Sequence, residues 1–374
     1  MTDAAQITDR RAPRAAPRPS RRRWLALVAA LVLSPVVAEG ALRIAGAEGV
    51  VLHRQEGRLL QKAEPPLPHR PLPDATATVE YRRRSGALVR RTRMSVNPEG
   101  YRGPLAGDGR PRVVCVGDSH TYGWGVDDDA PWPRVLERRL REAGRPDAEV
   151  LNLGVGGFAA DAELEWLRRE GLPRDPDVVL WQWFVNDLRL RDEGAERSAP
   201  QRSLAHWTSP WIGGWIGELR RVSRVADLGL QAIHARLVQT RGHFAHAAGS
   251  LEELDAWGRV LDAMRDARDA TERTGARFVV VAFPLLVRDG DAFASRPVDE
   301  RVLAALRGQG IECIDLGTLL PSGRARELRN SEIDYHPSEL GHRLAGEAVA
   351  RELLARGLDD RASAEAISPS GTRR

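Results

Sequence analysis

Five short apolar runs, separated by longer stretches with helical periodicity, constrain the fold of this chain more than any other feature. The apolar runs are Arg112–Val116, Glu149–Leu153, Val178–Phe184, Phe278–Phe283 and Ile311–Ile314. Runs of this kind are typical of strands buried on both faces of a parallel sheet. The helical patterns cover Pro131–Ala143, Ala160–Arg169, Leu251–Thr271, Val298–Leu306 and Ser338–Leu354. This alternation predicts an α/β fold: a three-layer α/β/α sandwich around a mainly parallel five-stranded sheet, which binds ligands at the carboxyl ends of its strands.

One large domain over residues 111–356 holds all of these elements. Residues 188–250 interrupt the alternation and are predicted to form a helical insertion between the third and fourth strands. Three tryptophans with four-residue spacing, Trp207, Trp211 and Trp215, allow two interpretations of the insertion. They either pack on the domain or form a lid or a membrane-touching face, because tryptophan favours the membrane interface.

Residues 47–110 precede the domain and divide into a linker and a β-hairpin. The linker, up to residue 75, is rich in proline and charge. Thr76–Arg83 and Ala87–Val96 then flank Ser85-Gly86 and carry β-branched and aromatic residues, which predicts the hairpin. At the other end of the chain, residues 357–374 are expected to be a disordered tail.

The N-terminal residues have the pattern of an export signal. The apolar run Trp24–Ala38 follows three arginines. We interpret residues 1–23 as a basic cytoplasmic leader and residues 24–46 as a transmembrane signal anchor. Two alternatives stay open: a cleaved signal peptide with Val36-Val37-Ala38 as its cleavage site, and a buried core helix. The anchor predicts a single-pass protein of the cell inner membrane with an extracytoplasmic domain, whereas cleavage predicts a secreted protein.

The distribution of charge and cysteine argues against several classes of partner. Residues 1–23 carry seven arginines and two aspartates, a charge of +5, while the whole chain carries +4. The folded body is therefore about −1, so no nucleic-acid partner is expected. Cys115 and Cys313 lie in apolar runs and are interpreted as free and buried, with a disulfide as the alternative. His243 and His246 are three residues apart but have no evident acidic or cysteine partner, so no metal and no cofactor are expected.

Four polar motifs occur at the predicted strand ends or before the last helix. Ser119 follows the first strand in Gly-Asp-Ser-His, where its hydroxyl faces the cleft as a candidate nucleophile and its own N–H faces an oxyanion. The second strand ends in Asn-Leu-Gly-Val-Gly-Gly, whose last glycine is Gly157, and the third is followed by Asn186. His336 precedes the last helix and is a candidate base for the serine, with a nearby carboxylate to orient it.

This order of motifs resembles the GDSL/SGNH hydrolases, over roughly residues 112–350. The resemblance implies a flavodoxin-like sandwich in which Ser119 is the nucleophile and His336 the general base. It implies an oxyanion hole made by the backbone N–H groups of Ser119 and Gly157 and by the side chain of Asn186. Asp334 would be the acid partner of His336. The anchor-like leader and the segment Asn97–Gly103 further resemble membrane-anchored bacterial members of the family.

The chain departs from the family pattern at two positions. The third block of the family is usually Gly-x-Asn-Asp, and here Phe184 takes the place of the glycine. The last block is usually Asp-x-x-His, but Asp334 lies only two residues before His336, and Ile333 stands where the acid is expected. Either Asp334 reaches the imidazole through a different turn or Glu332 replaces it.

Several neighbouring polar residues have less specific interpretations. His120 either lines the cleft or caps the helix after Ser119, and His342 on the last helix is interpreted as structural. Asp118 and Asp187 are expected to stabilise the loops that carry Ser119 and Asn186.

These observations predict an extracytoplasmic serine esterase that acts through an acyl-serine intermediate. The expected substrate is an O-acyl ester of an envelope glycan or a lipid. One alternative is an O-acyltransferase that moves the acyl group to a sugar hydroxyl. Another is a non-enzymatic envelope protein on a hydrolase fold.

Overall fold

A computed structural model describes residues 33–42, 44, 52–83, 87–188, 223, 225–226, 229, 255–332 and 334–357. Most of the predicted insertion, with its tryptophans and His243 and His246, lies outside these residues. The same holds for residues 1–32 and for the predicted tail beyond residue 357.

The centre of the molecule is a five-stranded parallel sheet, as the apolar runs predict. Its strand order is β12-β9-β8-β6-β7, and every neighbouring pair is parallel. The bounds are β6 Arg112–Val116, β7 Glu149–Asn152, β8 Val178–Trp183, β9 Arg277–Ala282 and β12 Glu312–Asp315. Because β7 and β8 flank β6 on opposite sides, the chain reverses its direction of winding at β6. The carboxyl end of β6 is therefore the switch point at which α/β sheets bind their ligands.

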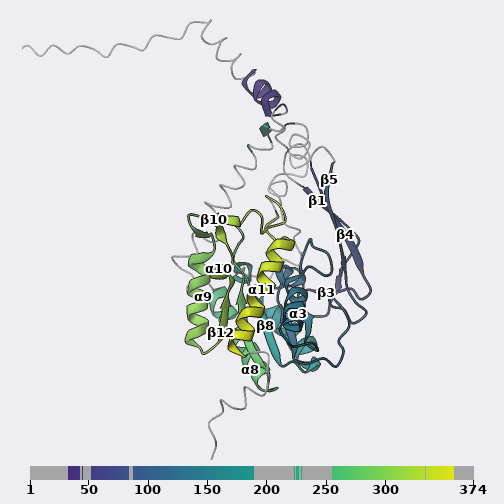
Figure 1. Cartoon of the computed structure of the whole chain (residues 1–374), viewed down its shortest axis with the longest axis vertical. Helices are drawn as coiled ribbons and strands as arrows, with labels where there is room; N and C mark the ends of the chain where they lie inside the picture. The colour runs from purple at the N-terminus through teal and green to yellow at the C-terminus, as the bar shows by residue number, and fades with distance from the viewer. Residues whose placement is uncertain are drawn as a thin grey trace, which may run out of the picture.

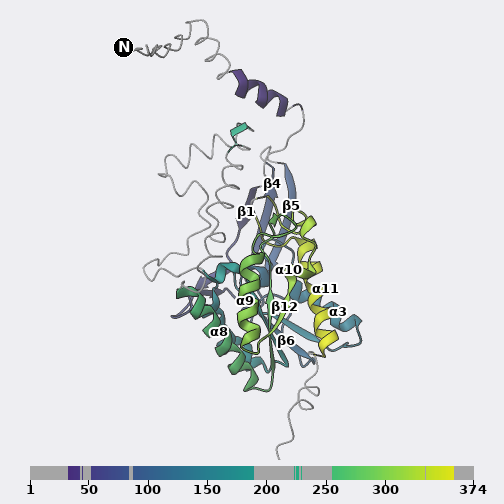
Figure 2. The ribbon, with the colours of Figure 1, turned by 90° about the vertical axis from the view of Figure 1, so that its left-hand side faces the viewer.

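Helices cover both faces of this sheet (Figure 1, Figure 2). One face carries the packed pair α3 and α11, and the other carries α8 and α9 (Figure 2). The bounds are α2 Ser119–Tyr122, α3 Trp132–Glu142, α4 Ala160–Trp166, η1 Leu167–Gly171, η2 Leu172–Arg174, η3 Val185–Leu188, α8 Asp255–Glu272, α9 Arg296–Gly308, α10 Leu316–Leu319, η6 Ser322–Arg324 and α11 Glu339–Arg356. Ser338 caps α11 as predicted, since its side chain accepts from the Gly341 N–H. The three-layer sandwich is thus confirmed.

Residues 52–96 form a second, antiparallel layer beside the sandwich (Figure 1). Its main sheet has the order β1-β4-β5, and β2 pairs with β3. The bounds are β1 Leu52–Glu56, β2 Leu60–Lys62, β3 His69–Pro71, β4 Thr76–Arg82 and β5 Leu88–Ser95. β4 and β5 pair at the predicted hairpin.

The linker expected up to residue 75 is corrected by the structure, because β1, β2 and β3 fall within it. These strands are three to five residues long and interrupted by proline and charge. β1 pairs with β4, which follows only after β2 and β3, and β2 and β3 pair with each other over three residues each, so local periodicity gives no sign of these strands. A small core that includes Leu59, Val79, Tyr81 and Met94 joins this layer to Tyr122 of the sandwich.

Among the described residues, no helix has both the length and the apolar character needed to span a bilayer. Residues 33–42 are helical, but most of the predicted anchor lies outside the described part of the chain, so the anchor stays a prediction.

A small hairpin formed by β10 Arg288–Asp289 and β11 Ala292–Phe293 follows β9.

The two cysteines are free and buried, which excludes the alternative of a disulfide. Burial raises the pKa of the Cys313 thiol to about 11 and that of the Cys115 thiol well above its ordinary value.

Candidate active site

Ser119 is presented by a tight turn between β6 and α2. The turn needs glycine at position 117, because a Cβ there would lie 2.5 Å from the side-chain oxygen of Gln182. The same oxygen accepts the Asp118 N–H at 3.1 Å. The Asp118 carboxylate then caps α2 by accepting the His120 N–H at 2.8 Å. These bonds place Ser119 as the first residue of α2, directly above the carboxyl end of β6.

The structure brings Ser119, His336 and Asp334 into one hydrogen-bonded row. The Ser119 Oγ and His336 Nε2 atoms are 2.9 Å apart, and His336 Nδ1 and Asp334 Oδ1 are 2.6 Å apart. The two-residue spacing works because Asp334 Oδ1 also accepts the backbone N–H of His336 at 3.2 Å, which folds the carboxylate back onto the ring. Of the two acids that the sequence leaves open, Asp334 is the one in contact, while Glu332 is exposed.

The negative charge of Asp334 and the positive charge of protonated His336 stabilise each other. Burial alone would raise the pKa of Asp334, but the charge and hydrogen bond of His336 outweigh it and lower the pKa to about 2. Burial would lower the pKa of His336, but Asp334 and then Asp118 raise it above its ordinary value. With Asp334 ionised, Nδ1 must be the protonated nitrogen, so Nε2 of neutral His336 faces the serine as an acceptor. This is the tautomer that a general base needs.

The glycine turn after β7 lies beside the serine. A Cβ built on Gly156 would be 3.8 Å from the Ser119 Cβ. Gly157 has a φ of +83°, a left-handed conformation that favours glycine. The His69 Nε2 atom of β3 is 2.8 Å from the Gly156 carbonyl oxygen and so links the turn to the antiparallel layer. The role of the Gly157 N–H as an oxyanion donor stays a prediction.

Asn186 is joined to the residue that precedes the nucleophile. Its side-chain nitrogen donates to Asp118 Oδ2 at 2.7 Å. An amide nitrogen carries two hydrogens, so this bond orients the group and leaves one N–H for another acceptor. Burial would raise the pKa of Asp118, but His120 and Asn186 lower it to about 2, so Asp118 stays ionised and holds both residues. Asp118 therefore stabilises this loop, as predicted.

Phe184, the residue in place of the family's glycine, packs on His120. Their ring centroids are 4.0 Å apart, and both side chains are buried. On its other sides the His120 ring lies 5.9 Å from Phe283 and 5.5 Å from His336. Phe184, which takes the place of the family's glycine, thus fills the space beside His120. It does not prevent the Asn186 side chain from bonding to Asp118. The His120 ring therefore packs beside the His336 ring, and the His120 backbone N–H donates to Asp118.

His342 has the structural role that the sequence predicts. It is buried, and its Nδ1 atom accepts the Trp132 backbone N–H at 3.2 Å. Burial lowers its pKa well below the ordinary value, so it stays neutral and ties α11 to the start of α3. Among the described residues, no group of three or more His, Cys, Asp or Glu side chains could hold a metal ion.

Sequence reasoning misses the side chains that the antiparallel layer brings to the site. Tyr81 donates to Asp334 Oδ2 at 2.9 Å, and His53 Nδ1 lies 4.0 Å from the same oxygen. Trp124, in the loop after α2, has its ring centroid 6.2 Å from that of His336 and 6.4 Å from that of His53. Tyr81 comes from the segment predicted to be a hairpin, and His53 comes from the segment predicted to be a linker. Neither residue belongs to a motif that includes Ser119, so the sequence alone does not indicate that they reach the site.

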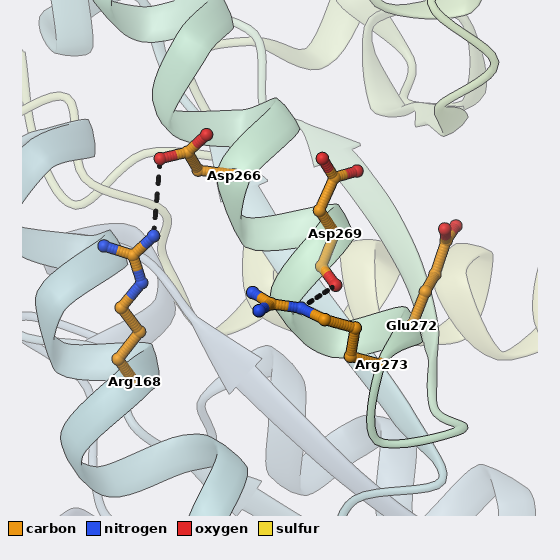
Figure 3. A pocket seen from close by; sticks show the side chains of 5 residues that line it. All are labelled: Arg168, Asp266, Asp269, Glu272 and Arg273. Carbon is orange, nitrogen blue, oxygen red and sulfur yellow. Dashed lines mark hydrogen bonds and ion pairs between the residues drawn. The ribbon is translucent and has the colours of Figure 1, made fainter.

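A surface hollow between η1 and α8 does not involve this site. It is lined by Arg168, Asp266, Asp269, Glu272 and Arg273 (Figure 3). The Arg168 guanidinium pairs with Asp266 at 3.3 Å, and Arg273 Nε donates to the Asp269 carbonyl at 3.0 Å (Figure 3). Arg168 and Asp266 neutralise each other, and the Asp269 carboxylate pairs with Arg268, 2.6 Å away, which does not line the hollow.

Comparisons with known proteins give a family match over more than half of the chain. The model of the GDSL-like lipase/acylhydrolase family matches residues 115–344. A curated relative, the uncharacterized lipoprotein YqeF of Bacillus subtilis (strain 168), is 33% identical over 98 residues, which are 26% of this chain. The chain spans only 40% of the length of that relative.

Solved structures of esterases and lipases are also similar to the chain. A lipase/acylhydrolase from Enterococcus faecalis is 15% identical, with a TM-score of 0.38 over 66% of this chain and 96% of that one. The acetylxylan esterase Axe2 from Geobacillus stearothermophilus, solved as a catalytic mutant, is 13% identical, with a TM-score of 0.39 over 67% of this chain and 95% of that one.

Proposed function

The chain belongs to the GDSL-like lipase/acylhydrolase family and is a hydrolase of ester bonds; from this premise we propose that Ser119 is its nucleophile and His336 its general base. The observation that carries the proposal is the row from Ser119 Oγ through both ring nitrogens of His336 to Asp334, with distances of 2.9 and 2.6 Å. A serine alone is a weak nucleophile, and this arrangement supplies both the base and the group that orients it.

In the proposed mechanism, His336 Nε2 takes the hydroxyl proton as Ser119 Oγ attacks the ester carbonyl carbon. The oxygen that becomes negative binds the N–H groups of Ser119 and Gly157 and the free side-chain N–H of Asn186. Asp334 stabilises the imidazolium, which then protonates the departing alkoxide. Water then attacks the acyl-serine carbonyl carbon and gives a proton to His336 Nε2. The bond to Ser119 Oγ breaks, the acid is released, and His336 returns the proton to Ser119 Oγ.

The proposal also includes an extracytoplasmic location, with residues 24–46 as the anchor. The leader supports it, because seven arginines precede an apolar run, in agreement with the positive-inside rule. The relative from Bacillus subtilis is described as a lipoprotein, a class of proteins held at a membrane. An enzyme in this place meets O-acyl esters of envelope glycans and lipids, which we propose as its substrate class.

Labelling with a fluorophosphonate probe tests the nucleophile. The purified full chain is expected to react, and Ser119→Ala and His336→Ala are expected to abolish labelling, whereas Ser322→Ala, which changes a serine outside the site, leaves it unchanged. An unlabelled wild-type chain, or a label that persists in Ser119→Ala, would reject the assignment. Acid release from short and long acyl esters, with and without a sugar acceptor, then separates a hydrolase from an acyltransferase.

A further inference from the structure

The second oxygen of Asp334 is held by a residue outside the matched family region. The Tyr81 hydroxyl donates to Asp334 Oδ2 at 2.9 Å, across 253 residues of sequence. Both side chains are buried, with exposed fractions of 1% for Tyr81 and 3% for Asp334. Since Oδ1 is occupied by His336, the tyrosine leaves neither carboxylate oxygen unpaired. His53 is too distant from Oδ2, at 4.0 Å, to replace it as a hydrogen-bond donor.

Tyr81 is itself fixed in position by the antiparallel layer. It lies in β4 between His53 of β1 and Arg90 of β5 in the sheet register. The Arg90 guanidinium lies over the Tyr81 ring, 4.3 Å from its centroid, and donates to Asn330 Oδ1 at 2.6 Å. A Cβ at position 125 would lie 2.1 Å from the Tyr81 hydroxyl, so Gly125 makes the space that this hydroxyl occupies.

The spacing between Asp334 and His336 explains why such a contact matters. Only one residue lies between them, and Asp334 Oδ1 accepts both the ring N–H and the backbone N–H of His336. Oδ2 then faces away from His336 in a buried region, where an unpaired carboxylate oxygen is unfavourable. Burial raises the pKa of the Tyr81 phenol well above its ordinary value, so the group stays protonated and able to donate.

From this geometry we infer that Tyr81 is a positioning residue for the reaction: its hydroxyl fixes the rotation of the Asp334 carboxylate and thereby the ring of His336. This inference rests on the proposed function. The antiparallel layer of residues 52–96 is then part of the catalytic unit, because it supplies the donor to Asp334 Oδ2 from outside the matched region, residues 115–344.

The decisive variant is Tyr81→Phe in the full chain, because it removes only the hydroxyl. We expect kcat for a small aryl ester to fall roughly tenfold to a hundredfold, the range for loss of a hydrogen bond to a charged group, with KM unchanged. Tyr101→Phe is the matched control, since Tyr101 is also buried but lies in the turn after β5, with Arg174 over its ring at 5.1 Å. This control is expected to keep the wild-type kcat.

A double-mutant cycle separates positioning from a general structural role. If Tyr81 acts through Asp334, then Tyr81→Phe costs nothing more in an Asp334→Ala background, although it does in the wild type. An equal loss in both backgrounds, or a wild-type kcat in Tyr81→Phe alone, would overturn the inference.

A measurement independent of turnover distinguishes this inference from the proposed function. In the 15N-labelled full chain, the His336 Nδ1 proton is expected to exchange faster with water in Tyr81→Phe than in the wild type or in Tyr101→Phe. If the wild type neither reacts with the fluorophosphonate nor cleaves esters, the proposed function fails, but the exchange comparison still decides the role of Tyr81. Equal exchange in all three proteins would contradict that role.

Discussion

At the scale of single residues, the carboxylate next to His336 is the point on which the sequence is least decisive. The family spacing would place the acid at position 333, where the chain has isoleucine. Asp334 contacts the ring instead, through a local turn in which one carboxylate oxygen accepts two N–H groups of His336. Residue types in the right order predict Ser119 and His336, but only the fold decides between Asp334 and Glu332.

Substitution of the two acids tests this assignment. Asp334→Asn is expected to lower kcat by about 10³–10⁴, because an amide cannot hold the tautomer and charge that the base requires. Glu332→Gln is the control and is expected to keep kcat within about twofold, since Glu332 is exposed and surface changes have small effects. Steady-state rates with an aryl ester measure both, and similar losses in the two variants would contradict the assignment.

The pH dependence of the reaction follows from His336. The base must be neutral, so kcat/KM rises as His336 loses its proton. The pKa of His336 is raised above its ordinary value by Asp334 and Asp118. The half-maximal rate on the acid side is therefore expected above about pH 6.5. A rate profile from pH 5 to 9 measures it, and in Asp118→Asn the midpoint should shift to lower pH. A wild-type midpoint below pH 6.5 would be inconsistent with this account.

At the scale of elements, the structure separates what periodicity can predict from what it cannot. The three inner strands of the parallel sheet, β6, β8 and β9, are buried on both faces, so each appears in the sequence as a nearly continuous apolar run. The strands β1, β2 and β3 are only three to five residues long and partly exposed, so they do not appear in the sequence as apolar runs. Their side chains nevertheless reach the site, as His69 does at the glycine turn. The fold of the sandwich is therefore predictable, but the residues that the antiparallel layer brings to the site are not.

Substitution of His69 tests whether β3 supports the glycine turn. His69→Ala removes the contact with the Gly156 carbonyl, worth about 0.5–1.5 kcal/mol for a typical hydrogen bond. If that energy holds the Gly157 N–H in place, kcat falls about twofold to tenfold. His69→Gln, which keeps a side-chain donor, is expected to recover part of the loss. An unchanged kcat in His69→Ala would show that the turn holds its shape without β3.

At the scale of the whole molecule, the antiparallel layer and the sandwich share a core. Leu59 from the segment between β1 and β2, Met94 of β5 and Tyr122 of α2 belong to one buried cluster. Arg102, almost fully buried, donates to the carbonyls of Tyr122 and Val126 and so ties the chain after β5 to the loop behind Ser119. These contacts indicate that the two layers unfold together.

Leu59→Ala tests this shared core. A buried leucine-to-alanine change costs about 2–5 kcal/mol, and 1 kcal/mol shifts the Tm of a domain of this size by about 2–4 °C. The Tm of the full chain is therefore expected to fall by roughly 4–20 °C in a single transition. Leu105→Ala, at a leucine that is 50% exposed, should leave it nearly unchanged. Two separate transitions in calorimetry, with only the smaller one shifted, would contradict a shared core.

If the proposed anchor holds the chain at a membrane, the position of β1 also limits the distance between the membrane and the active site. His53, the second residue of β1, lies 4.0 Å from the Asp334 carboxylate. If residues 24–46 span the bilayer as proposed, only six residues lie between the end of the span and His53, and the fully extended chain from residue 46 to His53 covers about 25 Å. The catalytic row would then be confined to a shallow zone above the lipid headgroups. Such an enzyme works on esters that come to the membrane surface and not on those deeper in the envelope.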